Sequence, residues 1–215
     1  MSLTAWCPRC REELEEALES SQSGPECPVH GVLPPLWKPD EVSYEEFAEH
    51  LRAAGDFPTY LPWPMSPGWS VTDFGVVTDD GSRTRAAVSC VSGTSELDGP
   101  VDVFVVTEEA GVGLGARVAC LVGDDPGREI GDGSPTVRVR IASQQVPLWS
   151  ISTSGADAAF DRSVFAGEAA GRWLWIVLRP ASAMLLLRDD WILRDVSGLG
   201  PPLLEMPFGG QRPVW

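Results

Sequence analysis

Four side chains near the start of the sequence have the types and the spacing of a metal-binding site. They form two pairs, Cys7-Pro-Arg-Cys10 and Cys27-Pro-Val-His30, with two residues inside each pair and sixteen between the pairs. A two-residue spacer lets both side chains of a tight turn point at one ion, which is the spacing of a two-knuckle zinc ribbon. Three thiolates and one imidazole suit Zn²⁺. The sequence therefore predicts one zinc ion per chain, bound by Cys7, Cys10, Cys27 and His30.

This ion is expected to be structural rather than catalytic. Protein side chains would fill all four positions and leave none for a water molecule or a substrate. The segment that carries them is short, and residues 11–23 are acidic and polar, so it has little apolar surface to bury. Metal binding can supply the missing folding free energy in such segments.

A redox-active thiol pair is the main alternative interpretation. Trp6-Cys7-Pro-Arg-Cys10 is similar to the Trp-Cys-x-x-Cys motif of thioredoxin-like proteins. In that fold the motif follows a strand and opens a helix within a βαβ unit. Six preceding residues are too few to provide that strand and its support, so the structural zinc site is favoured.

The other candidate motifs point to ordinary structure. Gly111-Val-Gly-Leu-Gly-Ala116 lacks the spacing of a dinucleotide-binding or P-loop motif, and it predicts a tight turn that enters a short helix. The acidic residues of 124–132 fit neither an EF-hand nor a Ca²⁺-binding repeat. His50 is expected on the exposed side of a helix, and Cys90 and Cys120 are expected to be buried as small apolar side chains.

No complete catalytic set is visible, so no catalytic residue is assigned and a non-enzymatic role is favoured over an enzyme. A second hypothesis remains open, in which the β-rich part holds a ligand or substrate pocket. Its candidate residues lie on neighbouring predicted strands: Asp102, Glu168, Arg172 and Trp175.

The elements that must position these residues are mostly strands. Ser43 predicts a helix N-cap, with a stop at Gly55. Four prolines predict an irregular strap over residues 57–69. Alternating Trp and aliphatic residues at 173–178 predict a strand buried on both faces. Short β-favouring runs separated by turn residues predict eight strands, at 71–78, 83–91, 101–107, 136–142, 146–152, 163–168, 172–179 and 191–196.

These patterns predict an α+β, mainly β protein with few short helices. A small N-terminal zinc ribbon is expected before an antiparallel β-rich sandwich or barrel-like domain. Changes in composition divide the chain into a zinc-ribbon-like module, a helix with the Pro/Trp-rich strap, the β-rich domain and an irregular Pro/Gly-rich tail, at residues 1–37, 38–69, 70–197 and 198–215.

The charge of the chain restricts its partners. A formal charge of −15 and a sequence pI near 4.4 disfavour nucleic acid and anionic membranes, and no run of basic residues opposes that average. No apolar run reaches the ~18–20 residues of a membrane span, and no signal peptide is visible. Five cysteines, an odd number, favour a reducing compartment. We therefore expect a cytoplasmic protein whose partner is another protein.

Six motifs of the chain stand out together: Cys7-Pro-Arg-Cys10, Cys27-Pro-Val-His30-Gly31, Pro34-Pro35-Leu36-Trp37, Gly111-Val-Gly-Leu-Gly-Ala116, Val164-Phe-Ala-Gly-Glu168 and Arg172-Trp-Leu-Trp175. With this set the chain resembles an uncharacterised family of actinobacterial proteins. This resemblance implies an intracellular bacterial protein with an N-terminal zinc-ribbon-like segment, and it brings no established reaction or ligand. Some members carry the label phosphotransacetylase, which we discount because acetyl transfer between phosphate and coenzyme A needs a basic anion site.

Overall fold

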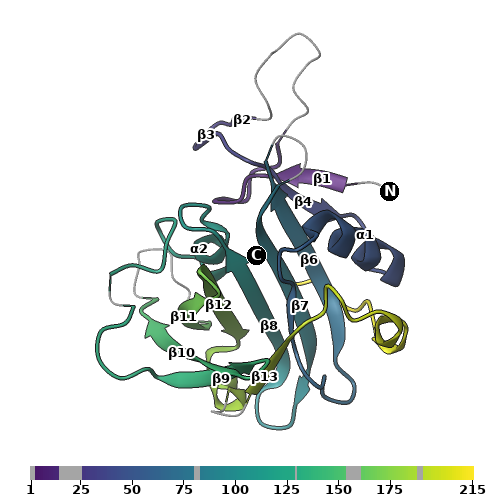
Figure 1. The fold of residues 1–215 in the computed structure, drawn as a ribbon, viewed down its shortest axis with the longest axis vertical. Coiled ribbons are helices and arrows are strands. Elements are labelled where there is room, and N and C mark those ends of the chain that lie inside the picture. The colour runs from purple at the N-terminus through teal and green to yellow at the C-terminus, as the bar shows by residue number, and fades with distance from the viewer. Residues whose placement is uncertain (1–2, 15–25, 80–82, 129, 154–160, 188–190) are drawn as a thin grey trace.

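The protein is mainly β, as the sequence predicts: of the residues that the structure describes, 43% lie in strands and 15% in helices. The computed structural model describes residues 3–14, 26–79, 83–128, 130–153, 161–187 and 191–215 (Figure 1). No helix in these ranges is long and apolar enough to cross a bilayer.

Eleven strands form one large sheet in the order β1-β4-β6-β7-β8-β12-β11-β10-β9-β13-β5. All neighbours are antiparallel except β13 and β9, which are parallel. All eight predicted strands are present, and β1, β4 and β5 extend the sheet beyond them. The strands are β1 (Leu3–Trp6), β4 (Leu36–Pro39), β5 (Tyr60–Pro62), β6 (Ser70–Thr78), β7 (Thr84–Ser95), β8 (Gly99–Glu108), β9 (Val137–Ile141), β10 (Gln144–Ile151), β11 (Ser163–Ala169), β12 (Arg172–Arg179) and β13 (Trp191–Asp195).

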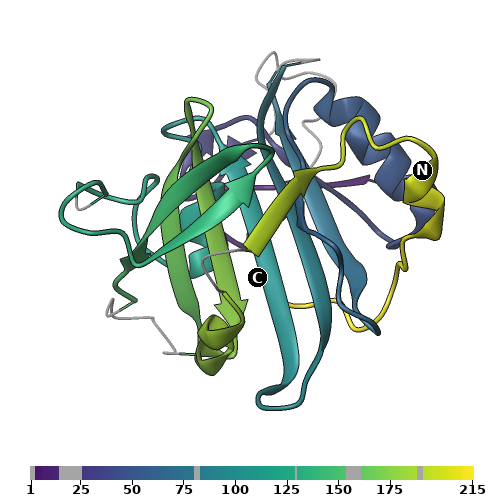
Figure 2. The same ribbon diagram turned by 60° about the horizontal axis from the view of Figure 1, so that its bottom comes forward.

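The sheet rolls up so that its last two strands lie across the face of its middle strands (Figure 2). Ser89 of β7 donates a 2.6 Å hydrogen bond from Oγ to the carbonyl oxygen of Tyr60 in β5. The expectation of an irregular strap at residues 57–69 is therefore wrong in part. β5 lies at the edge of the sheet, where Pro62 is tolerated because an edge strand does not need every N–H for pairing.

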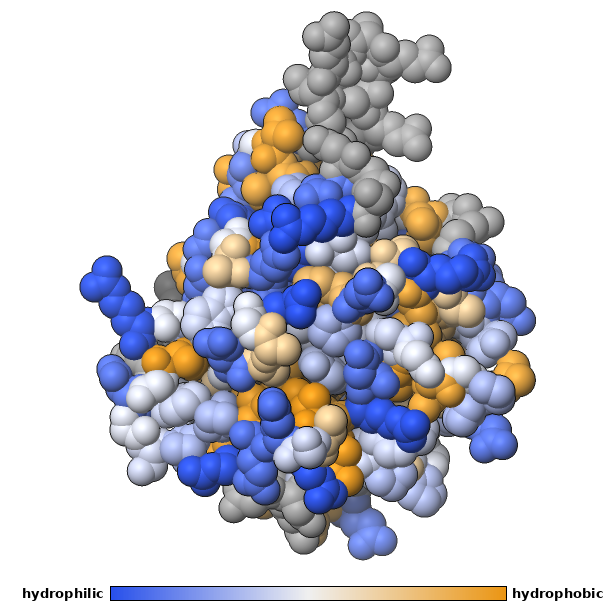
Figure 3. Space-filling model, in the orientation of Figure 1, coloured by the Kyte–Doolittle hydropathy of each residue, from blue (hydrophilic) through white to orange (hydrophobic). Residues whose placement is uncertain are grey.

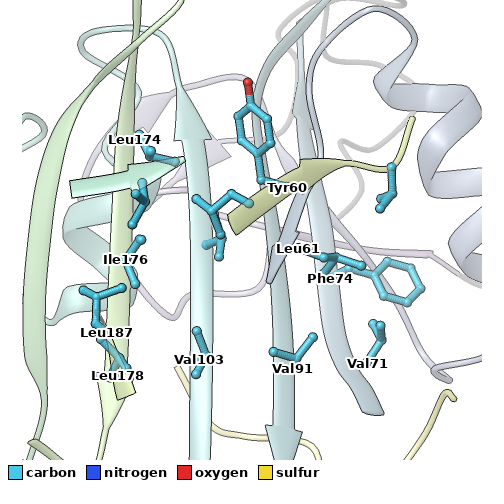
Figure 4. Packing of buried hydrophobic residues seen from close by; sticks show 14 of the residues in the cluster. Tyr60, Leu61, Val71, Phe74, Val91, Val103, Leu174, Ile176, Leu178 and Leu187 are labelled. Carbon is cyan, nitrogen blue, oxygen red and sulfur yellow. The ribbon is translucent and has the colours of Figure 1, made fainter. Parts of the chain in front are cut away.

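Strand β12 separates two apolar clusters, which is why its sequence is apolar on both faces. Figure 4 shows the first cluster inside the rolled sheet, where Leu174, Ile176 and Leu178 face the same interior as Leu61. The second cluster lies on the other face of the sheet and contains Trp175, whose side chain is completely buried. The prediction of a strand buried on both faces is confirmed.

Helix α1 (Tyr44–Ala54) packs against β6 and β7 and has the predicted caps. Ser43 Oγ accepts a 3.2 Å hydrogen bond from the backbone N–H of Glu46. Gly55 has φ +57° and ends the helix with an N–H that bonds to the carbonyl of Leu51. The positive φ favours glycine at this stop.

His50 is buried on α1, so the expectation that it lies on the exposed side is wrong. Its ring stacks on Phe47 at 5.6 Å between centroids, and Nε2 lies 3.3 Å from Thr59 Oγ1. The buried face of this helix includes position 50 because Phe74 of β6 and Thr59, which precedes β5, cover the His50 ring. Burial lowers the pKa of His50 to about 4.

This histidine predicts a specific loss of stability in acid. The unfolded state binds its proton at the ordinary pKa near 6.5 and the folded state only near 4, so the contribution of His50 is complete above pH 6.5 and is lost as the pH falls toward 4. The loss amounts to about 2 kcal/mol at pH 5. Urea unfolding of wild type and His50→Gln at pH 7 and pH 5 measures it: the wild type should lose about 2 kcal/mol more than the variant. Equal losses would show that folding does not lower the pKa of His50.

Candidate metal centre

The first ligand pair, Cys7 and Cys10, lies in the turn of a hairpin that begins with β1. This turn is called the first knuckle, and the turn that carries Cys27 and His30 is called the second. The backbone N–H of Cys7 donates to the carbonyl of Glu12 at 2.9 Å, and the N–H of Leu14 donates to the carbonyl of Ala5 at 2.8 Å. Within the turn, the N–H of Arg9 points at Cys7 Sγ at 3.4 Å. N–H groups directed at sulfur stabilise thiolate character, as is usual where cysteine binds a metal.

The second knuckle is the turn between two short strands, β2 (Glu26–Cys27) and β3 (Gly31–Val32). Gly31 adopts φ +71°, which lets the chain turn back directly after His30. The side chains of Cys27 and His30 therefore leave the same turn on the same side, and Cys27 Sγ lies 3.6 Å from His30 Nδ1.

The two knuckles face each other and bring all four predicted ligands together. The ligand atoms of Cys7, Cys10, Cys27 and His30 lie within 4.8 Å of one another. Cys7 Sγ is 3.5 Å from His30 Nδ1, and Cys10 Sγ is 3.6 Å from Cys27 Sγ. A tetrahedral zinc ion with ordinary bond lengths would separate sulfur from sulfur by about 3.8 Å and sulfur from nitrogen by about 3.6 Å. The four residues thus fit a tetrahedral metal ion.

The thiols differ in their acidity when no metal is bound. Burial raises the pKa of Cys7 to about 12. Burial also acts to raise the pKa of Cys27, but hydrogen bonds from the backbone N–H groups of Val29 and His30 outweigh it and lower the value to about 7. Cys7 is completely buried, and its raised pKa disfavours the thiolate that a redox-active Cys7 would need. The geometry favours a metal centre over the thioredoxin-like alternative.

The first knuckle is anchored to the main sheet by Arg9. Its Nε donates to the carbonyl of Val112 at 3.2 Å, its Nη2 donates to the carbonyl of Gly111, and it forms a 3.0 Å ion pair with Asp124. Gly113 adopts φ +89°, and a Cβ at this position would lie 2.9 Å from the Arg9 side chain. The glycine-rich motif is therefore a docking loop for the knuckle.

The same motif then enters helix α2 (Leu114–Ala119), as the sequence predicts. The buried carboxylate of Glu108 accepts hydrogen bonds from the N–H groups of Leu114 at 2.7 Å and Gly115 at 3.2 Å, which fixes the start of the helix. Burial raises the pKa of Glu108 to about 7 against the effect of these bonds. A Cβ at Gly115 would lie 2.2 Å from the indole of Trp175, so the packing admits only glycine there.

Comparison with known proteins identifies the family to which the chain belongs. The model of a family of unknown function, DUF6758, matches residues 1–214, which include both knuckles and every strand of the sheet. The chain belongs to the DUF6758 family. No curated protein and no solved structure matches it.

In this DUF6758 chain, the four candidate residues of the alternative hypothesis, a ligand or substrate pocket in the β-rich part, lie apart from one another. Asp102 of β8 lies opposite Arg179 in the register of β8 and β12, and Arg179 is at the other end of β12 from Arg172. Glu168 is exposed, the guanidinium of Arg172 lies over the ring of Phe57 at 4.5 Å, and the indole of Trp175 belongs to the core. These residues do not form a common site.

The two remaining cysteines lie outside the metal centre. Cys90 is completely buried, as expected. Cys120 is only half-buried, so the expectation of full burial is wrong, and Nη1 of Arg162 lies 3.1 Å from its sulfur. It follows the last turn of α2 with φ 55°, which turns its side chain toward this arginine rather than into the second apolar cluster.

Sequence reasoning missed the parts that fix the centre to the sheet. Arg117 of α2 donates from Nη1 to the carbonyl of Cys7, and Arg9 docks on residues more than one hundred positions away. An arginine between two cysteines is a weak signal, because most exposed arginines in such turns face solvent. Only the fold shows what these two arginines contact.

Proposed function

We propose that this protein is a non-enzymatic intracellular zinc-binding protein in which one structural Zn²⁺ ion holds an interaction module on a β-rich scaffold. The observation that carries the proposal is the mutual approach of the four ligand atoms to within 4.8 Å. Three sulfurs and one nitrogen at tetrahedral spacing favour zinc over Ca²⁺ or Mg²⁺, which prefer oxygen.

A structural role follows from the closure of the site. Each corner of the tetrahedron has a protein ligand, so a bound ion would have no open position for a substrate. Within the part of the chain that the structure describes, the apolar cluster around the site has few buried members, namely Cys7, Leu14 and Cys27. Because this cluster is small, the metal would supply most of the free energy that orders the two knuckles.

An interaction role is supported by the surface of the second knuckle. Val29 and Val32 have exposed fractions of 69% and 59%. Figure 3 shows apolar surface gathered at the narrow end of the molecule over β2 and β3. Apolar side chains fixed on a rigid, metal-bound turn can dock on another protein with little loss of conformational entropy. We propose that a protein partner binds there, in the cytoplasm of an actinobacterial cell.

Elemental analysis of the purified protein tests the metal, and about one zinc per chain is expected. The interaction is tested by comparing proteins that co-purify with wild type and with Val32→Ser. Leu97→Ser is the matched control, because Leu97 is also exposed but lies in the β7–β8 turn. A chain without bound zinc, or a partner lost equally with both variants, would contradict the proposal.

A further inference from the structure

A pocket of about 430 Å³ lies beside the metal centre, where four segments far apart in the sequence meet. The N-terminal hairpin supplies Trp6 and Arg11, β4 supplies Lys38, and α2 supplies Arg117. The C-terminal segment closes the pocket with Arg212 and Trp215. This volume lies within the range of pockets that hold small molecules.

The pocket gathers positive charge in a strongly acidic protein. Four of the sixteen basic residues of the chain line it, including its single lysine. The carboxylates of Asp40, in the lining, and Asp73, buried behind it, offset two of these charges. A zinc ion with three thiolates would add one negative charge nearby, and the excess would remain positive. A cationic pocket on a chain of charge −15 concentrates small anions locally.

Two tryptophans give the pocket aromatic walls. Lys38 Nζ lies 3.8 Å from the ring centroid of Trp215, and the guanidinium of Arg117 lies 4.9 Å from it. The same guanidinium lies 5.9 Å from the ring centroid of Trp6. The two cations lie over the ring of Trp215, which is 3% exposed, so the accessible aromatic surface of the pocket belongs to the half-buried Trp6.

Among the described residues, some hydrogen-bond donors of this pocket have no strong acceptor. Arg117 is 6% exposed, yet its one hydrogen bond among the described residues goes to the carbonyl of Cys7, and its Nε has no acceptor there. Arg11 contacts the sulfur of Cys120 at 3.6 Å, which is a weak acceptor. Guanidinium groups in this situation suit the paired oxygens of a carboxylate or a phosphate.

We propose that this pocket binds a small organic anion, with a carboxylate or phosphate group held by Arg11, Lys38 and Arg117 and a planar apolar part held against Trp6. The proposal does not depend on the protein partner proposed above. The site is not visible in the sequence, because its basic residues come from positions 11, 38, 117 and 212.

A change in the protonation of Lys38 provides a measurable signature of anion binding. Burial lowers its pKa to about 8; the Asp73 carboxylate opposes this shift, and the Arg212 and Arg117 guanidinium groups add to it. Arg11 and Asp40 also line the pocket around it. An anion bound beside Lys38 raises this pKa, so binding near pH 8 takes up a proton. Calorimetry in two buffers of different ionisation enthalpy measures that uptake.

Isothermal titration calorimetry with four probes tests the proposal. Phenyl phosphate and benzoate each combine a ring with an anion, inorganic phosphate is an anion alone, and benzyl alcohol is an uncharged ring. The expected result is saturable binding of at least one aromatic anion, about 10-fold tighter than either inorganic phosphate or benzyl alcohol, with proton uptake at pH 8. Binding of phenyl phosphate without benzoate assigns phosphate as the anion, and the reverse assigns carboxylate.

Arg11→Gln should weaken the binding about 10-fold, because a charge-assisted hydrogen bond is lost while the zinc content stays unchanged. Arg52→Gln is the matched control, since this exposed arginine on α1 pairs only with Glu49 among the described residues. The proposal is overturned if neither aromatic anion binds, if benzyl alcohol binds equally well, or if Arg11→Gln binds like wild type.

Discussion

Replacing Cys10 by serine should reduce the zinc content from about one per chain to almost none and lower the free energy of unfolding by at least about 3 kcal/mol. Cys10 supplies one corner of the proposed tetrahedron, with its sulfur 3.6 Å from that of Cys27. Apolar packing cannot replace the metal, because among the described residues Leu14 is the only large aliphatic side chain buried in the cluster around the centre, and its burial contributes only about 2 kcal/mol.

The loss should be local before it is global. Hydrogen exchange should accelerate in residues 3–14 and 26–33 of Cys10→Ser, while β7, β8 and β12 keep their protection under native conditions. Treatment of the wild type with a zinc chelator should reproduce this pattern. Cys120→Ser is the matched control, because Cys120 is a half-buried cysteine outside the centre, and it should keep both its zinc and its protection. Unchanged protection after zinc removal would contradict a structural role.

Asp73→Asn should destabilise the protein by about 3–5 kcal/mol. The Asp73 side chain is completely buried and forms ion pairs with Lys38 at 2.9 Å and with Arg212 at 2.7 Å. Oδ2, the carboxylate oxygen that faces Lys38, also accepts a 2.6 Å hydrogen bond from the indole N–H of Trp215. An asparagine of the same size leaves two cations without a counter-charge and turns an N–H₂ group toward other donors.

Urea unfolding measures this effect, and hydrogen exchange locates it. The segment 208–215 should lose protection first, because Asp73 attaches Arg212 and Trp215 to β6. Asp98→Asn is the control: Asp98 accepts a hydrogen bond from Ser95 in a hairpin turn and has no ion pair among the described residues. It should change the stability by less than about 0.5 kcal/mol. A similarly small change in Asp73→Asn would show that Lys38 and Arg212 do not depend on this carboxylate.

The meeting of the four candidate ligands was predictable because their geometry is local. Each pair of ligands lies within one tight turn, so spacing alone determines which side chains can reach a common ion. The same is true of the Ser43 cap and of the turn into α2, which depend on residues within one helical turn. The eight main strands were predictable from runs of β-branched residues between turn signals.

The errors of sequence reasoning concern contacts over long distances along the chain. His50 was expected at the surface because helical periodicity shows which residues share a face and does not show how much of the helix a rolled sheet covers. β5 was missed because its pairing with β13 joins residues more than 130 positions apart, and its prolines indicate loop when only local preference is considered.

The sequence by itself determined a set of four candidate metal ligands, eight of the strands and the acidic charge of the chain. Only the tertiary structure decided where that metal unit docks and which basic residues meet. Arg11, Lys38, Arg117 and Arg212 lie far apart in the sequence, and the antiparallel sheet and the return of the C-terminal segment bring them around one pocket. Spacing along a chain determines short-range geometry, whereas a pocket built from four segments depends on how all of them pack.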